Sequence, residues 1–406
     1  MTEATASGNS REQLGRGSAE EEQVLKPLIK WPGGKGSEIG RFASLIPDYD
    51  RYIEPFVGGG AVYFYLKPEK AAINDISENL MDFYRLVRDQ DQEFKRMLEL
   101  YQSSFSRLKE LCDVRYYDIL TLYRIYERAE QEGCDVKDLK LNLGLVSQIV
   151  QDPGVMTELV LDQGEFLEQM LRMTEDKILR TVRNDKEKPF VSKDLKANLV
   201  TGFTSGFYMY FRDIFNQIAS GKLVASKPYE IANFYFIREY CYGSMFRYNA
   251  KGEFNIPYGG VSYNGKDFNA KVKHIFGEEV GRLLKRTEIA CQDFEEFLNG
   301  LDLNERDFLF LDPPYDTDFS DYEGKEFGKA DQKRLADFLK NTKAQFLLVI
   351  KNTSYIYSLY CDSGFRMLTF DNRYLYNMRS RNDRKAEHLL ITNIPEEAVP
   401  WMRENF

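Results

Sequence analysis

The stretch FLFLDPPYDTDF, residues 308–319, constrains the fold more than any other part of the chain. Its leading run of large apolar residues is typical of a strand buried within a sheet. Pro313 and Pro314 follow closely, and two successive prolines prevent a helix or a strand from continuing. The pattern therefore predicts a buried strand that ends at Asp312 and leaves its carboxylate at the edge of the sheet.

Strand and helix patterns alternate over much of the rest of the chain. Short strands are expected within RYIEPF, KAAINDI, TEIACQ, DFLFLD and AQFLLVIKN. Helices are expected between or after them, and the helix SENLMDFYRLVRD begins at the polar cap Ser77. Strands that alternate with helices indicate an α/β fold with a parallel sheet covered on both faces.

Three other regions differ from this alternating part. Residues 1–23 are polar without periodicity, which predicts a disordered tail. Residues 91–200 repeat Glu, Lys, Leu and Gln at helical spacing and are expected to form a helical insertion. Residues 203–265 are strongly aromatic, and from Gly202 to Lys273 nine Lys or Arg stand against five Asp or Glu. This region is net basic in a chain whose formal net charge is −9.

Composition argues against several classes of protein. Five cysteines are scattered without a C-x-x-C pair and only two histidines occur, so neither a zinc site nor a disulfide framework is expected. No apolar stretch approaches the roughly 20 residues of a membrane span, and residues 1–23 lack a signal-peptide core. We therefore expect a cytoplasmic protein with no membrane attachment and no metal. The acidic net charge argues against a nucleic-acid partner, but a local basic face still acts within a Debye length of roughly 10 Å.

A glycine loop and an acid point to a nucleoside-like ligand. The segment EPFVGGG, from Glu54 to Gly60, follows a predicted strand, and its glycines let the backbone approach a bound nucleotide or amino acid closely. Asp75 ends the next strand, where a carboxylate can accept hydrogen bonds from ribose hydroxyls. An ordinary tight turn is the alternative for the loop alone. A dinucleotide such as NAD is a second alternative, although the loop is not G-x-G-x-x-G.

The residues that end the FLFL strand suit a planar ring with an exocyclic amine. Ligands of an open parallel sheet bind beyond the carboxyl ends of its strands, where Asp312 is expected. Pro313 and Pro314 fix the backbone, so the Pro313 carbonyl becomes a second acceptor beside the carboxylate. Tyr315 offers a flat surface for stacking. The alternative is a structural Pro-Pro turn with a capping acid.

Five motifs occur in the order found in the Dam-type (class alpha) DNA adenine-N6 methyltransferases, and the chain resembles this family over most of residues 28–90 and 203–395. They are KWPGGK (30–35), EPFVGGG (54–60), NDI (74–76), FRYNAKGEFNIPYG (246–259) and DPPY (312–315). The resemblance implies a Rossmann-like methyltransferase sheet with an inserted, mainly helical DNA-recognition domain. It implies a catalytic domain of residues 24–95 and 276–406, and a recognition domain of residues 96–275 with its helical insertion at about 100–200.

The resemblance also implies the ligands and their residues. S-adenosylmethionine would be the cofactor, bound by Trp31, Lys35, Phe56, Gly58, Gly60, Asp75 and Asp312. The catalytic residues would be Asp312, Pro313, Pro314 and Tyr315. Double-stranded DNA would be the partner, contacted by Lys30, Tyr242, Arg247, Asn249, Lys251 and Pro257. The target adenine would be flipped out of the duplex, and no metal would be needed.

The basic and aromatic region has two interpretations. Lys30 and Arg247 are expected to read guanine edges, and exposed aromatics such as Tyr242 to insert into a base stack. A buried aromatic core is the alternative, and it is expected to hold for most of the aromatic residues there. The chain departs from the family at Gly243, where the family has an asparagine, and at Gly260-Val261, where it has a basic-aromatic pair.

The residues leave other functions open. Cytosine-N4 methylation needs a similar amine geometry, so DPPY alone does not distinguish adenine from cytosine. An RNA adenine methyltransferase, a non-catalytic DNA-binding protein of the same fold and a nicotinamide oxidoreductase are further alternatives. We expect a monomer of prokaryotic or phage origin, with a cognate restriction endonuclease system as a candidate partner and GATC as one candidate recognition sequence.

Overall fold

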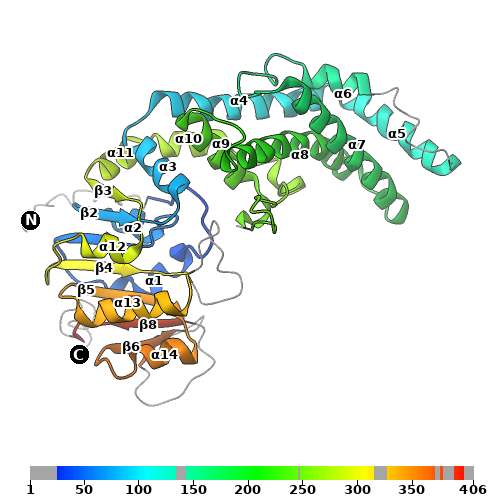
Figure 1. Cartoon of the computed structure of the whole chain (residues 1–406). Helices are drawn as coiled ribbons and strands as arrows, with labels where there is room; N and C mark the ends of the chain where they lie inside the picture. The colour runs from blue at the N-terminus through cyan, green and yellow to red at the C-terminus, as the bar shows by residue number, and fades with distance from the viewer. Residues whose placement is uncertain are drawn as a thin grey trace, which may run out of the picture.

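The computed structural model describes residues 25–133, 143–245, 247–314, 327–370, 375–377 and 388–396. A sheet covered by helices forms one part of the molecule, and a long arm of helices extends from it (Figure 1). The predicted tail, residues 1–23, lies outside the described residues. No helix in the described ranges is long and apolar enough to cross a membrane.

The sheet has eight strands in the order β3-β2-β1-β4-β5-β8-β6-β7. The first five in this order run parallel, whereas β8 is antiparallel to both β5 and β6, and β6 is antiparallel to β7. The strands are β1 Arg51–Glu54, β2 Ala71–Asn74, β3 Thr287–Ala290, β4 Asp307–Leu311, β5 Gln345–Lys351, β6 Arg366–Phe370, β7 Leu375–Asn377 and β8 His388–Thr392. The parallel part confirms the predicted α/β fold, and the antiparallel edge is an addition that the sequence analysis missed.

Helices pack on both faces of this sheet, as the sequence predicts. Along β4, Phe308 and Phe310 point into the hydrophobic core on one face, and Leu309 and Leu311 point into the core on the other. The strand is therefore buried on both sides up to the residue before Asp312. One face is covered by α1 Ile39–Phe42, α2 Ala61–Leu66, α3 Glu78–Arg88 and α11 Glu278–Lys285, and the other by α12 Phe294–Asn299, α13 Lys329–Asn341 and α14 Ser354–Tyr360.

The predicted helical insertion forms the arm. Its helices are α4 Gln92–Val114, α5 Tyr116–Glu132, α6 Leu143–Val150, α7 Gln163–Glu187 and the start of α8 Ser192–Ala219, which continues beyond residue 200. Helices α9 Lys227–Tyr240 and α10 Phe268–Ile275 follow the predicted insertion in the chain. Helices α7 and α8 pack closely because glycines of α8 face α7: a Cβ atom at Gly206 would lie 2.8 Å from the sulfur of Met170.

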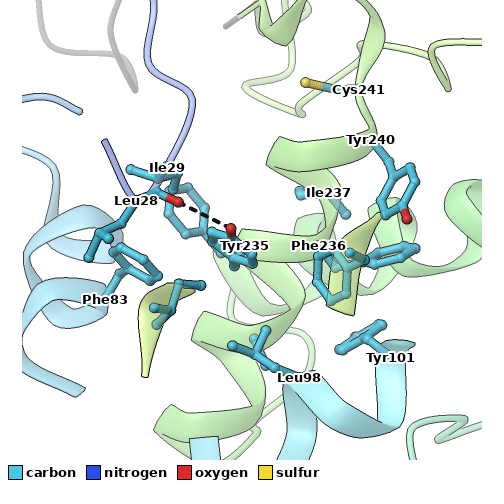
Figure 2. Close-up of a cluster of buried hydrophobic side chains, with 14 of the residues drawn as sticks. Leu28, Ile29, Phe83, Leu98, Tyr101, Tyr235, Phe236, Ile237, Tyr240 and Cys241 are labelled. Carbon is cyan, nitrogen blue, oxygen red and sulfur yellow. Dashed lines mark hydrogen bonds between the residues drawn. The ribbon is translucent and has the colours of Figure 1, made fainter. Parts of the chain in front are cut away.

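Helix α9 connects the arm to the sheet-bearing part through buried aromatic residues (Figure 2). The ring of Tyr235 stacks on Phe83 of α3 at 5.2 Å between centroids, and its hydroxyl donates to the Leu28 carbonyl at 3.1 Å. On the arm side, Phe236 stacks on Tyr101 of α4 at 4.7 Å. Most aromatic residues of this region therefore form a core, in agreement with the second of the two interpretations of the segment.

Candidate active site and nucleic-acid interface

The chain order reverses between β1 and β4, which lie side by side at the centre of the parallel part of the sheet. In open α/β sheets such a reversal leaves a crevice at the carboxyl ends of the two strands, where ligands bind. A cavity of about 450 Å³ lies there, which we call the switch-point pocket. Its lining comes from residues 31–35, 54–62, 74–77, 292–294, 310, 312–314, 327 and 331.

The triple glycine allows two segments of the pocket to meet. Gly58 has φ +47°, and a Cβ atom there would lie 2.7 Å from Cδ1 of Trp31. At Gly59 a Cβ atom would lie 3.1 Å from the Ile29 carbonyl oxygen. Gly60 also has a positive φ, +68°, which favours glycine. The three glycines therefore allow the Trp31 segment to pack closely on the loop of residues 58–60. They also line the switch-point pocket.

Asp75 holds the glycine loop in place from the end of β2. Its carboxylate accepts hydrogen bonds from the backbone N–H of Gly58 and of Ser77, each at 3.0 Å. Burial raises the pKa of Asp75 above its ordinary value, although these bonds act in the opposite direction. Tyr84 donates to the Gly58 carbonyl at 2.8 Å and secures the loop from the other side.

Asp312 is paired with Lys35, a contact between two segments 277 residues apart in the chain. The ammonium nitrogen of Lys35 lies 2.7 Å from each carboxylate oxygen and also donates to the Gly33 carbonyl at 2.9 Å. Burial raises the pKa of Asp312 to about 6, even though the Lys35 charge lowers it. The turn is held from behind, because Gln332 of α13 donates to the Pro314 carbonyl at 3.0 Å. The sequence analysis named Lys35 and Asp312 but did not foresee the pair.

The pocket is rich in carboxyl groups, because Glu54, Asp293 and Asp331 line it besides Asp75 and Asp312. Glu54 at the end of β1 is 3% exposed and accepts a hydrogen bond from the Tyr52 hydroxyl at 2.7 Å. Burial, with the nearby Asp312 and Asp75, raises the pKa of Glu54 well above its ordinary value. Among the described lining residues, Lys35 is the one basic side chain. Such a site favours a ligand that carries positive charge.

Most of the residues predicted to contact DNA lie on one segment of the chain. All but Lys30 lie on the segment from Cys241 to Tyr258, which we call the recognition hairpin because Cys241 pairs with Tyr258 and Tyr248 with Phe254. Lys30 and Tyr242 have exposed side chains, at 39% and 55%. The other predicted contacts, Arg247, Asn249, Lys251 and Pro257, also belong to the hairpin.

Hydrogen bonds within the recognition hairpin fix its shape. Arg247 donates to the Asn255 side chain at 3.1 Å. Asn249 accepts from the backbone N–H of Lys251 and of Glu253, at 2.9 and 3.0 Å, which forms the turn. The N–H of Tyr242 donates to the Pro257 carbonyl at 2.9 Å.

Arg238 is a site residue that the sequence analysis missed. It is 1% exposed on α9, and its guanidinium donates to the carbonyls of Lys30, Ser244 and Met245 at 3.0 to 3.1 Å. The guanidinium carbon also lies 5.5 Å from the ring centre of Trp31. Arg238 therefore connects the segment that lines the pocket to the recognition hairpin. A charged residue inside the apolar run FYFIREY was the available signal.

Two residues of the sequence analysis cannot be placed. Tyr315 of the DPPY motif and Phe246 of the hairpin lie outside the described residues. Within the described ranges, no cluster of three or more His, Cys, Asp or Glu side chains could hold a metal ion.

Comparisons with known proteins agree on one family. The model of the D12 class N6 adenine-specific DNA methyltransferases matches residues 31–143 and 168–375. The type II methyltransferase M.CviBI of Paramecium bursaria Chlorella virus NC1A is 27% identical over 374 residues, which cover 91% of this chain and all of that protein. The type II methyltransferase M.MjaIII of Methanocaldococcus jannaschii is 27% identical over 82% of this chain and 85% of its own length. The DNA N-6-adenine-methyltransferase of Escherichia phage P1 is 24% identical over 86% of this chain and 34% of its own length.

Proposed function

This chain belongs to the D12 class N6 adenine-specific DNA methyltransferase family, and we propose that it binds S-adenosylmethionine in the switch-point pocket and receives a flipped adenine at Asp312. Membership of the family makes the chain an enzyme that methylates the N6 amine of adenine in DNA. The proposal therefore concerns which residues do this and how. The observation that carries it is the convergence of Asp75, Asp312 and the glycine loop on one cavity of about 450 Å³.

The charge of the pocket supports the cofactor. S-adenosylmethionine carries a sulfonium and an ammonium group against one carboxylate, and it supplies an electrophilic methyl group when bound. The carboxyls of Asp75, Asp293, Asp312 and Asp331 outnumber the single ammonium of Lys35 among the described lining residues, without counting the buried Glu54, whose pKa is raised. Two unit charges about 4 Å apart interact by roughly 4 kcal/mol at an effective dielectric constant of about 20. A cationic ligand is thus favoured over the dianionic pyrophosphate of a nicotinamide dinucleotide.

Several residues would hold the cofactor. Asp75 would accept hydrogen bonds from the ribose, since each of its oxygens retains a lone pair after bonding one N–H. Trp31 and Phe56 would offer apolar surface, and Gly58 and Gly60 would let the backbone approach closely. Lys35 would act mainly through the position and charge of Asp312.

The target amine would be oriented rather than deprotonated in advance. One N–H of the adenine amine would donate to the Asp312 carboxylate and the other to the Pro313 carbonyl. These bonds draw charge onto a nitrogen whose lone pair is otherwise delocalised into the ring. Holding the nitrogen in line with the methyl group supplies as much as roughly 7–11 kcal/mol. Asp312 then lies where it can stabilise the positive charge that develops on the nitrogen and accept the proton that leaves.

The DNA would lie along the recognition hairpin and Lys30. Base flipping costs a few kcal/mol, which contacts to the backbone and insertion of the exposed Tyr242 would offset. In this proposal residues 96–275 form the recognition domain, and residues 24–95 with 276–406 form the catalytic domain. We further propose a monomer that acts on duplex DNA inside a prokaryotic or phage-infected cell, alongside a cognate restriction endonuclease system.

Transfer of labelled methyl groups to duplex DNA tests the catalytic assignment. Asp312→Ala should abolish transfer while the protein still folds, because the amine loses its oriented acceptor. Retained activity in Asp312→Ala would remove Asp312 from the mechanism. Calorimetric titration with S-adenosylmethionine tests the pocket separately, and Asp75→Ala should weaken that binding. Unchanged cofactor affinity in Asp75→Ala would reject the ribose assignment.

A further inference from the structure

A second lysine, Lys266, lies beside Lys30 at the base of the recognition hairpin. Its ammonium nitrogen lies 3.3 Å from the centre of the Tyr263 ring and donates to the Glu239 carbonyl oxygen. The Lys30 ammonium lies 6.0 Å from the same ring and 3.9 Å from a carboxylate oxygen of Glu239. The two lysines, from segments more than 200 residues apart, thus share the Tyr263 ring and both contact Glu239, Lys266 at its main-chain carbonyl and Lys30 at its carboxylate.

These two ammonium groups are not neutralised by the acid between them. Glu239 is 2% exposed, and its Oε1 atom has no hydrogen-bond partner in the described part of the chain. Burial, followed by the nearby Lys30 charge, lowers the pKa of Lys266 to about 7. The neighbouring Asp267 is exposed and caps α10 through the Ala270 N–H. At neutral pH Lys266 is therefore only partly protonated, and an anion bound between the two lysines would raise this pKa and hold both ammonium groups charged.

The lysine pair borders the recognition hairpin directly. The Tyr263 hydroxyl accepts a hydrogen bond from the N–H of Gly243 at 3.0 Å, next to the exposed Tyr242. Both lysine side chains are partly exposed at this place. A ligand bound on the recognition hairpin next to Tyr242 would therefore lie close to Lys30 and Lys266.

We propose that Lys266 and Lys30 together bind one backbone phosphate of the DNA, with Tyr263 as the platform between them. This proposal rests on the proposed function, since it assumes that the hairpin contacts DNA. A phosphate fits better than a guanine edge, because an ammonium is a compact point charge without the planar fork of arginine. When both lysines are protonated, the two ammonium groups and the Glu239 carboxylate sum to one positive charge, and one phosphate carries one negative charge.

The competing explanation is structural. Lys266 bonds a carbonyl in the last turn of α9, where a cation favourably meets the helix dipole. A residue with that role alone would affect stability but not the salt dependence of DNA binding. A phosphate contact instead contributes about 0.9 to the slope of log affinity against log salt concentration.

Fluorescence anisotropy with a labelled random-sequence duplex tests the phosphate contact, because such a contact does not depend on the recognition sequence. Dissociation constants are measured from about 50 to about 200 mM salt for the wild type and for Lys266→Gln. The slope of the variant should be shallower by about 0.9, so the wild-type advantage in affinity should shrink about threefold over this range. Lys266→Arg keeps the charge and should retain the wild-type slope.

The matched control is Lys343→Gln, an exposed lysine before β5 at the opposite end of the strands, which should leave the slope unchanged. An unchanged slope in Lys266→Gln would overturn the proposal, whether or not the variant is less stable. Weaker binding confined to duplexes with guanine, and absent when inosine replaces it, would also overturn it in favour of base contact. If the wild type itself transfers no methyl group to DNA, the proposed function fails rather than this inference.

Discussion

Replacing Lys35 with glutamine would test whether this lysine keeps Asp312 ionised. The Lys35 ammonium lies 2.7 Å from both carboxylate oxygens, and the pKa of Asp312 is nevertheless raised to about 6 by burial. An opposite charge at such a distance depresses a carboxyl pKa by roughly 1–3 units. Its removal should therefore move the pKa of Asp312 from about 6 to roughly 7–9.

The expected loss of activity follows from the ionised fraction of Asp312. A carboxyl with a pKa of about 6 is about 90% ionised at pH 7, and one with a pKa of roughly 7–9 is between about 50% and about 1% ionised. Methyl transfer at pH 7 should thus fall by about 2- to 90-fold in Lys35→Gln and recover as the pH rises. The wild type should lose activity as the pH falls through about 6, because protonation removes the acceptor.

The assay is single-turnover transfer of labelled methyl groups at saturating S-adenosylmethionine, from about pH 5 to about pH 10. Saturation removes any effect of Lys35 on cofactor affinity from the measured rate. Asp312→Asn serves as the control, since the pH dependence assigned to the carboxylate should be absent there with or without Lys35→Gln. A Lys35→Gln enzyme whose rate is lowered equally at every pH would refute the reasoning.

Three other substitutions address the contacts around the site. Arg238→Met removes three charge-assisted hydrogen bonds and should lower the free energy of unfolding by about 3–5 kcal/mol in urea titrations. It should also weaken both cofactor and DNA binding. A free energy of unfolding equal to that of the wild type would contradict this prediction. Gly58→Ala places a Cβ atom 2.7 Å from Trp31 and should lower the melting temperature and the cofactor affinity. The control Gly36→Ala, with open space around it, should change neither. Equal effects of the two substitutions would exclude the close contact as the cause. Tyr242→Ala should fold normally, since the side chain is 55% exposed, but should show less 2-aminopurine fluorescence at the target base, and wild-type fluorescence would reject its role in base flipping.

The sequence was informative where a signal is local. The end of β4 at Asp312, the glycine loop after β1 and the Ser77 cap of α3 each depend on a few consecutive residues, and the structure contains all three. The Dam-type resemblance, built on five such local motifs, was confirmed by the family match. Membership of the family also decides between adenine and cytosine, which the DPPY residues alone left open.

Contacts between distant segments were beyond the sequence analysis. Lys35 and Asp312 are 277 residues apart and meet because the Trp31 segment packs on the glycine loop after β1, and β1 lies beside β4 in the sheet. The pairing of β8 with β5 and the position of Lys266 beside Lys30 have the same origin in the tertiary fold. The periodicity of the sequence does not predict such contacts, because each partner is typical of its own local segment.

The hydrogen bonds of Arg238 bear on how this enzyme can change its target. The three oxygens that it bonds, on Lys30, Ser244 and Met245, are all main-chain carbonyls, which every amino acid supplies. Side chains of the recognition hairpin can therefore be exchanged during evolution without loss of this anchor. Under the proposed function, in which the hairpin contacts DNA, substitutions of its side chains would alter sequence preference while the main-chain bonds to Arg238 keep the hairpin attached to the segment that lines the pocket.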